Sequence, residues 1–247
     1  MSLVVHKYGG SSVADADMIK SVARRITDAR KKGTGVVAVV SAMGDSTDDL
    51  IDLARSVSSQ PHPHEMDLLL STGELVACTL LTMALEDLGQ EAVSLTGSQA
   101  GIHTDTSHGQ ARIDRVDTAR MLQELGEGRI VVVAGFQGIT EDEDITTLGR
   151  GGSDTTAVAL AATLQADRCE IYTDVDGIYT ADPRIVPDAR KLDEISYDEM
   201  LEMASLGAKM NPRSIELAAV YDVPILVAST FEDVQGTLIH GGPQMME

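Results

Sequence analysis

The sequence predicts a single α/β domain with a mostly parallel sheet that helices cover on both faces. Short apolar runs alternate along the chain with longer segments that have helical periodicity, which is typical of this class. The runs VVAVV (36–40) and IVVVA (130–134) are what strands buried on both faces show. A length of 247 residues, 43% of them hydrophobic, is enough for one large core.

Each element is predicted from its own pattern. Strands are short apolar runs, and helices repeat apolar residues every three to four positions. We expect strands near 3–7, 36–41, 92–96, 130–134, 169–173 and 224–228. We expect helices near 15–32, 46–57, 65–87, 117–126, 153–165, 197–205 and 213–221. The polar segment 101–116 predicts a hairpin or flap, and the loop GITEDEDIT (138–146) predicts a crossover rather than a linker.

Composition limits the function classes. The formal net charge of -20, from 39 acidic and 19 basic residues, disfavours binding to nucleic acid or anionic membranes. We find no apolar run long enough to cross a bilayer and no leader, so we expect a cytoplasmic protein. Cys78 and Cys169 lie in apolar segments and are expected to be buried thiols. His62 and His64 lie in a proline-rich loop with no third ligand nearby, which favours a surface loop over a zinc site.

The segment TTLGRGGSDTTA (146–157) predicts an anion site. Its glycines allow backbone N–H groups to approach a ligand, and a helix that begins near Ser153 would direct its positive dipole end at the same point. Arg150 adds a planar fork of donors for a carboxylate or phosphate. The dinucleotide fingerprint fails, because Asp154 stands at its third glycine position, and the chain has neither a P-loop nor a protein-kinase signature.

A second anion site is predicted at the start of the chain. Lys7 ends a strand and is followed, after Tyr8, by the turn residues Gly9, Gly10, Ser11 and Ser12. A lysine in that position can place a point charge on a phosphoryl group while the turn donates hydrogen bonds. The alternative is a solvent-exposed lysine beside an ordinary turn.

Seven motifs together resemble the aspartokinases of the amino-acid kinase family. They are KYGGSS (7–12), VVSAMGDSTDDL (39–50), STGE (71–74), VAGFQG (133–138), TTLGRGGSDTTA (146–157), TDVDGIYTADPR (173–184) and GAKMNPRS (207–214). They occur in the order and spacing of that family and cover almost the whole chain. The resemblance implies a three-layer αβα sandwich that transfers a phosphoryl group from MgATP to the side-chain carboxylate of L-aspartate.

The resemblance also implies roles for individual residues on the amino-acid side. Lys7 would act on the transferring phosphoryl group and Asp154 would orient Lys7, although an aspartate is also favoured at a helix N-terminus by the dipole. Glu74 would bind the substrate ammonium group, although alone it reads as a helix cap. Arg150 would clamp a carboxylate, supported by Ser41, Thr47 and Ser153, and Phe136 would wall the pocket, although an aromatic there is as often simple packing.

The nucleotide half is expected from about residue 165 to 247. Beside Lys7, Gly9, Gly10 and Ser11, the resemblance assigns to ATP the residues Thr173, Asp174, Tyr179, Asp182, Arg184 and Lys209. Asp176-Gly177 is by itself a hairpin turn signal. No carboxylate cluster marks a metal cage, so Mg²⁺ is expected to be held largely by the phosphates, with no protein ligand assigned.

Two departures from the family pattern stand out, at Asn211, where a histidine is usual, and at Ala228, where an arginine is common. The chain stops soon after GTLIHGG, so we expect no regulatory ACT domains and a kinase without feedback control. Homo-oligomerisation is compatible with the sequence. The alternatives are a non-catalytic nucleotide-binding subunit and a kinase for another small acid. Retention of Lys7, Glu74, Arg150 and Asp154 favours an active enzyme.

Overall fold

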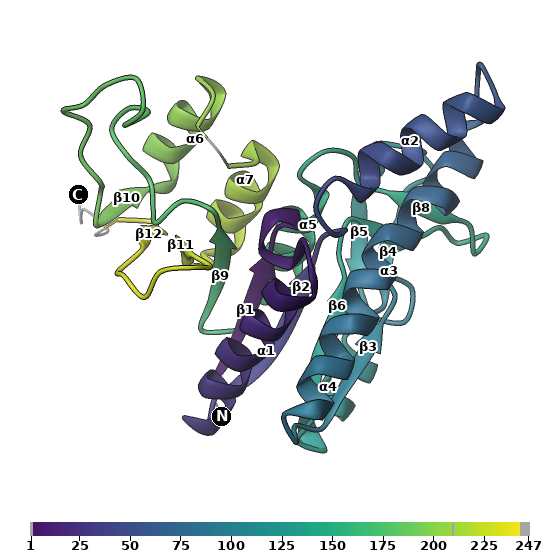
Figure 1. Ribbon diagram of the computed structural model, residues 1–247, viewed down its shortest axis with the longest axis horizontal. Helices are drawn as coiled ribbons and strands as arrows, with labels where there is room; N and C mark the ends of the chain where they lie inside the picture. The colour runs from purple at the N-terminus through teal and green to yellow at the C-terminus, as the bar shows by residue number, and fades with distance from the viewer. Residues whose placement is uncertain (1, 209, 243–247) are drawn as a thin grey trace.

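A central eight-stranded sheet organises the chain in the computed structural model, which describes residues 2–208 and 210–242 (Figure 1). Its strand order is β10-β12-β11-β9-β1-β2-β6-β3. The strands are β1 (Leu3–Tyr8), β2 (Gly35–Val40), β3 (Ala92–Leu95), β6 (Ile130–Ala134), β9 (Arg168–Thr173), β10 (Glu194–Ser196), β11 (Ile225–Ser229) and β12 (Thr237–His240). All neighbours from β11 to β3 pair in parallel, and β12 runs antiparallel to β11. The predicted mostly parallel sheet is therefore confirmed.

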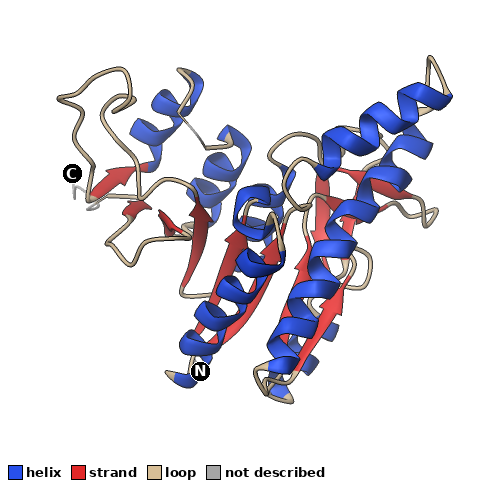
Figure 2. Ribbon diagram, viewed as in Figure 1, coloured by secondary structure: helices blue, strands red, loops and turns tan. Residues whose placement is uncertain are grey.

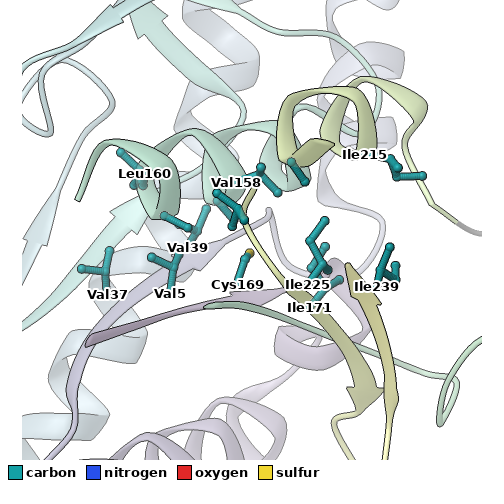
Figure 3. Close-up of a cluster of buried hydrophobic side chains, with 14 of the residues drawn as sticks. Val5, Val37, Val39, Val158, Leu160, Cys169, Ile171, Ile215, Ile225 and Ile239 are labelled. Atoms are coloured by element: carbon teal, nitrogen blue, oxygen red, sulfur yellow. The ribbon is translucent and has the colours of Figure 1, made fainter. Parts of the chain in front are cut away.

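Helices cover both faces of this sheet, so the predicted three-layer arrangement is confirmed as well (Figure 2). One face packs against α1 (Ala16–Lys31) and α3 (Pro63–Asp87). The other packs against α4 (Ala119–Gly126), α5 (Gly152–Thr163), α6 (Tyr197–Ser205) and α7 (Pro212–Tyr221). Successive strand residues point to opposite faces; Val5 and Val39, for example, pack toward Val158 of α5 (Figure 3).

A smaller sheet adjoins the ends of these elements, with strand order β5-β4-β7-β8. Its strands are β4 (Ile102–Thr104), β5 (Ile113–Val116), β7 (Gln137–Ile139) and β8 (Ile145–Thr147). The antiparallel pair β4–β5 confirms the hairpin expected in 101–116. The expectation of a crossover loop at 138–146 was wrong, because β7 and β8 form a hairpin in which Ile139 pairs with Ile145 across the acidic turn.

A second correction concerns Asp176-Gly177, which does not turn a hairpin. Between β9 and β10 the chain runs through turns with an isolated bridge from Tyr179 to Lys191. Gly177 has φ +153°, and a Cβ there would lie 2.6 Å from the Thr237 hydroxyl oxygen. The glycine is explained by this close approach to β12 rather than by a two-residue turn.

The remaining helix, α2 (Ser46–Val57), packs along α3 and buries none of its residues. We expected no apolar run long enough to cross a bilayer, and this was wrong, because α3 is long enough and apolar enough to do so. In the structure 44% of its most apolar stretch is buried inside the protein. Helices in the core of a protein can be equally long and apolar, and α3 packs as a core helix does, with Leu81 and Leu85 fully buried against the sheet. Cys78 and Cys169 are buried free thiols, as expected.

Candidate functional site

The carboxyl ends of the central parallel strands meet the N-terminus of α5, and an ion pair marks the meeting point. Lys7 near the end of β1 places its Nζ 2.6 Å from Oδ1 of Asp154 in the first turn of α5. Both side chains are largely buried, with 12% and 14% of their surface exposed. β1 lies between β2 and β9, and crevices beside such a central strand are where open α/β sheets bind ligands.

The turn after β1 packs tightly against the loop that follows β2. A Cβ at Gly10 would lie 3.0 Å from the carbonyl oxygens of Ala42 and Gly44, and the Gly44 N–H donates to the Gly10 carbonyl at 3.1 Å. A Cβ at Gly9 would lie 3.5 Å from Lys7 Nζ. Ser11 is exposed at this turn, whereas Ser12 is buried. The Gly9 backbone thus lies close to the lysine, and the exposed Ser11 follows it by two residues, an arrangement compatible with a phosphate cradle.

Glu74 projects from α3 into the same region and is 3% exposed. Its Oε1 accepts a hydrogen bond from the Ala42 N–H at 3.2 Å, next to Ser41, while Oε2 is buried without a hydrogen-bond partner among the described residues. Burial raises the pKa of Glu74 to about 7. A buried carboxylate oxygen with spare acceptor capacity suits a cationic ligand group such as an ammonium.

The glycine-rich loop 148–152 takes the left-handed backbone that its glycines permit. Gly149 has φ +78° and Gly151, the N-cap of α5, has φ +75°. The start of α7 holds this loop through two bonds to its carbonyl oxygens: Asn211 Nδ2 donates to Arg150 at 3.1 Å, and Arg213 Nη1 donates to Leu148 at 3.4 Å. The Arg150 side chain itself is exposed.

Phe136 follows β6 in a strained conformation beside this loop, with φ +68°. Its N–H donates to the Thr156 hydroxyl oxygen at 3.2 Å, and its carbonyl accepts from the Leu148 N–H at 2.8 Å. Ser153 is close as well, because a Cβ at Gly135 would lie 2.8 Å from its hydroxyl oxygen. Backbone strain of this kind collects at functional sites, which supports a site at this strand end.

The residues predicted for the nucleotide are less closely gathered. Thr173 ends β9 and donates to Asp174 at 3.0 Å, and Tyr179 donates to Asp176 at 3.0 Å. Asp182 accepts from Nη2 of Arg184 at 2.7 Å, and Arg184 is 87% exposed. This arginine lowers the pKa of Asp182 to about 2. Lys209 lies outside the described residues.

The sequence did not predict several residues that shape this region. Asn211, noted only as a departure, holds the Arg150 carbonyl, and Thr156 supports Phe136. Lys191 donates to Asp176 at 3.1 Å and to the Gln235 carbonyl at 2.8 Å. Only the polar character of these residues within apolar or loop segments could have indicated them. In the part of the chain that the structure describes, no group of three or more His, Cys, Asp or Glu side chains is placed to hold a metal ion.

Comparison with known proteins gives a consistent result. The model of the amino acid kinase family matches residues 2–229. The aspartokinase of Mycolicibacterium smegmatis is 60% identical over 243 residues, which are 98% of this chain and 58% of that protein. The chain thus spans under two thirds of the length of this relative.

Solved structures agree with that match. The aspartate kinase from Synechocystis superposes with a TM-score of 0.87 at 49% identity, covering 100% of this chain and 41% of that one. Escherichia coli aspartokinase III in complex with aspartate and ADP superposes with a TM-score of 0.89 at 30% identity, covering 97% of this chain and 65% of that one. With the eight-stranded sheet and the family match over most of its length, this chain belongs to the amino acid kinase family.

Proposed function

We propose that this protein transfers the γ-phosphoryl group of ATP to the side-chain carboxylate of L-aspartate, giving 4-phospho-L-aspartate and ADP, the first step toward lysine, threonine and methionine. The observation that carries the proposal is that the Lys7–Asp154 ion pair, the glycine-rich loop with Arg150 and the buried carboxylate of Glu74 belong to one region. One oxygen of that carboxylate has no hydrogen-bond partner among the described residues. Similarity to a protein solved with aspartate and ADP supports this choice of substrates.

The reaction needs little beyond positioning and charge neutralisation. A substrate carboxylate is ionised at neutral pH, so its oxygen attacks the γ-phosphorus without a general base. The new bond joins that oxygen to phosphorus, the bond to the bridging oxygen breaks, and its electron pair leaves on ADP. Lys7, held by Asp154, stabilises the negative charge on the transferring group.

Substrate recognition divides between Glu74 and Arg150 in this proposal. Oε2 of Glu74 accepts the α-ammonium group, and Arg150, on a loop held by α7, clamps a carboxylate. Ser41, Thr47 and Ser153 add polar contacts, and Phe136 walls the pocket. These groups lie on elements up to α5, so we assign the amino-acid substrate to that part of the chain.

We assign ATP to the segment after α5, with Gly9, Gly10 and Ser11 around the phosphates. Thr173, Asp174 and Tyr179 lie at the end of β9 and in the turns beyond it, and we assign them to the nucleoside. Asp182 and Arg184 pair with each other, and Arg184 is largely exposed, so we assign the two to the nucleotide as a pair. The described residues do not fit an all-protein metal cage, and we propose that Mg²⁺ is bound chiefly by the phosphates.

Trapping the acyl phosphate with hydroxylamine tests the proposal. The purified chain is incubated with ATP, Mg²⁺ and either aspartate, glutamate or a related acid, and hydroxamate is measured. We expect ATP-dependent hydroxamate with aspartate. If hydroxamate formed only with another acid, that acid and not aspartate would be the substrate. If the chain bound nucleotide but formed no hydroxamate with any acid, a non-catalytic subunit would be favoured. We also propose that the protein acts in the cytoplasm.

A further inference from the structure

The helix that carries Glu74 also carries a second buried carboxylate with no part in the proposed reaction. Asp67, Ser71 and Glu74 follow the spacing i, i+4, i+7 along one edge of α3 and are 1%, 1% and 3% exposed. Burial of an ionised carboxylate is unfavourable unless hydrogen bonds replace its hydration. The groups that supply those bonds therefore indicate what Asp67 holds in place.

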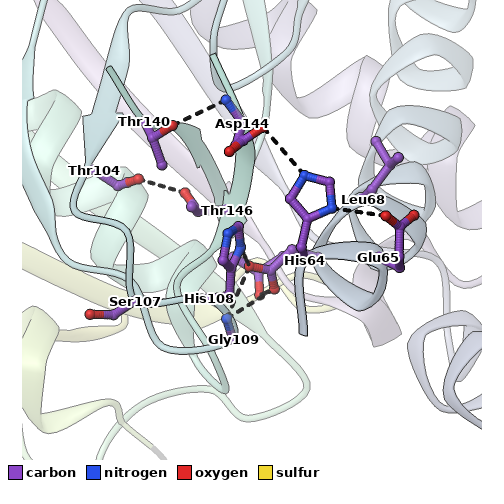
Figure 4. A network of polar contacts seen from close by, with 12 residues as sticks. His64, Glu65, Leu68, Thr104, Ser107, His108, Gly109, Thr140, Asp144 and Thr146 are labelled. Atoms are coloured by element: carbon purple, nitrogen blue, oxygen red, sulfur yellow. Dashed lines mark hydrogen bonds and ion pairs between the residues drawn. The ribbon is translucent and has the colours of Figure 1, made fainter. Parts of the chain in front are cut away.

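Asp67 accepts hydrogen bonds from two separate segments. Oδ2 accepts from Nδ1 of His108 at 2.8 Å, and both carboxylate oxygens lie 3.0 Å from the Gly109 N–H (Figure 4). These two donors belong to the loop between β4 and β5. The third donor is the Thr147 hydroxyl at the end of β8, which bonds to Oδ1. One carboxylate thus joins α3 to both hairpins of the small sheet.

Both segments lead directly to the glycine-rich loop. Arg150 follows Thr147 by three residues, and the Thr147 carbonyl accepts from the Ala111 N–H at 2.9 Å, which closes the β4–β5 loop onto β8. The Gly109 carbonyl oxygen lies 3.0 Å from the position that a Cβ at Gly149 would occupy. The β4–β5 loop therefore rests against the backbone immediately before Arg150.

We propose that Asp67 is a positioning residue for Arg150: it clamps the loop 105–111 and the end of β8, and these two supports fix the glycine-rich loop in the geometry that presents Arg150 to the substrate carboxylate. Asp67 does not touch the substrate in this account. The inference deepens the proposed function, on which its kinetic readout rests.

The kinetic test compares Asp67→Asn with a matched control. In Asp67→Asn the carbonyl oxygen can still accept from Gly109 and Thr147, but the amide nitrogen cannot accept from His108 and the negative charge is lost. The variant therefore weakens the clamp while it keeps the shape of the side chain. We expect KM for aspartate to rise by more than roughly tenfold, because the variant loses one hydrogen bond to a charged group and also the charge that strengthens the other bonds, with KM for ATP and kcat nearly unchanged. Thr147→Val removes a single donor and should raise the same KM by a smaller factor.

The control is Thr104→Val. Thr104 is buried in the same small sheet, and its hydroxyl bonds to Thr146 rather than to Asp67 (Figure 4). It should lower Tm without changing KM for aspartate. If Thr104→Val raised KM as much as Asp67→Asn, the effect would be general destabilisation and the proposal would be wrong.

A double-mutant comparison tests whether Asp67 acts through Arg150. If it does, Asp67→Asn changes KM for aspartate in the wild-type background and has almost no further effect once Arg150→Ala is present. Independent, multiplicative effects in the double variant would overturn the proposal.

Amide hydrogen exchange tests the Asp67 clamp without depending on whether the protein is catalytically active. In Asp67→Asn, and to a smaller extent in Thr147→Val, amides in 105–111 and 148–152 should exchange faster, whereas Thr104→Val should leave 148–152 unchanged. Unchanged exchange in both clamp variants would overturn the proposal. If the wild-type chain formed no acyl phosphate, the proposed function would fail, and exchange would still decide whether the clamp exists.

Discussion

Glu74 is the residue whose environment most directly predicts a pH effect. Its pKa is raised to about 7 by burial, and only the carboxylate form can accept a substrate ammonium group. We expect the Kd for aspartate to rise roughly tenfold between pH 8 and pH 6, because the ionised fraction of Glu74 falls by that factor. Calorimetric titration across this range measures it. Glu74→Gln should bind weakly and without this dependence; a wild-type Kd constant from pH 6 to 8 would contradict the assignment.

The same residue predicts a stability effect. The pKa of about 7 in the folded state lies above the ordinary glutamate pKa of 4.5, so the native state binds more protons between these pH values, and the free energy of unfolding falls as pH rises through this window. Glu74→Gln removes the buried charge. We expect it to raise the free energy of unfolding at pH 8 by about 2–3 kcal/mol and to have little effect near pH 5. Urea unfolding at both pH values tests this, and equal effects at the two pH values would count against it.

The Lys7–Asp154 pair allows stability and catalysis to be separated. Lys7→Ala should lower kcat by about a hundredfold or more, because a preorganised charge on the transition state contributes about 2.7–4 kcal/mol. It also leaves Asp154, 14% exposed, without its cation, so Tm should fall. Adding Asp154→Asn should restore Tm without restoring kcat. Recovery of turnover in the double variant would show that Lys7 acts only as a structural partner.

Single residues show how far sequence reasoning reaches. Lys7 and Asp154, which lie 147 positions apart, were paired through the resemblance of their motifs to the family, and the ion pair in the structure agrees with that expectation. The burial of Asp67 could not be predicted, because its three donors come from a loop and a strand that local patterns do not place beside α3. The mutual pairing of Asp182 and Arg184 also depends on the geometry of an irregular loop.

At the scale of elements, the start of α5 depends on a contact with α7. Gly151 has φ +75°, and a Cβ there would lie 2.1 Å from Nδ2 of Asn211. Gly151→Ala should therefore displace Asn211, release the Arg150 carbonyl and raise KM for aspartate. Gly33→Ala is the matched control, because Gly33 has φ +86° and no atom of the described residues lies within 4 Å of its Cβ position. It should cost only backbone strain of about 1–2 kcal/mol, with kinetics unchanged. Equal KM values in both variants would contradict this account.

Elements with a strong local signal were predicted closely. Buried runs such as β2 and β6, and helices such as α2 and α6, follow from periodicity alone. The hairpin β7–β8 was missed because its strands have three residues each, too short for an alternating pattern. The hairpin turn predicted at Asp176-Gly177 was wrong, because the glycine is required there by its close approach to Thr237 and not by a turn.

At the scale of the whole molecule, net charge predicts a response to salt. The formal net charge is -20, so the excess carboxylates repel one another in the folded state, and added salt screens that repulsion. We expect Tm to rise by about 2–4 °C between low and moderate NaCl, the shift that 1 kcal/mol produces at this size. KM for ATP should rise over the same range, because the cations around the phosphates are screened too. Differential scanning calorimetry and initial rates test both, and a falling Tm would contradict the first.

The central claim is that the Lys7 site transfers phosphate to a side-chain carboxylate of aspartate. Phosphorus NMR of the chain with ATP, Mg²⁺ and aspartate tests it most directly, with Lys7→Ala as the matched control. The account predicts that the γ-phosphate signal is lost as ADP and an acyl-phosphate signal appear together, and that both appear at least about a hundredfold more slowly with Lys7→Ala. ADP and inorganic phosphate without an acyl-phosphate signal, and without hydroxamate when hydroxylamine is added as a trap in a parallel sample, would contradict it.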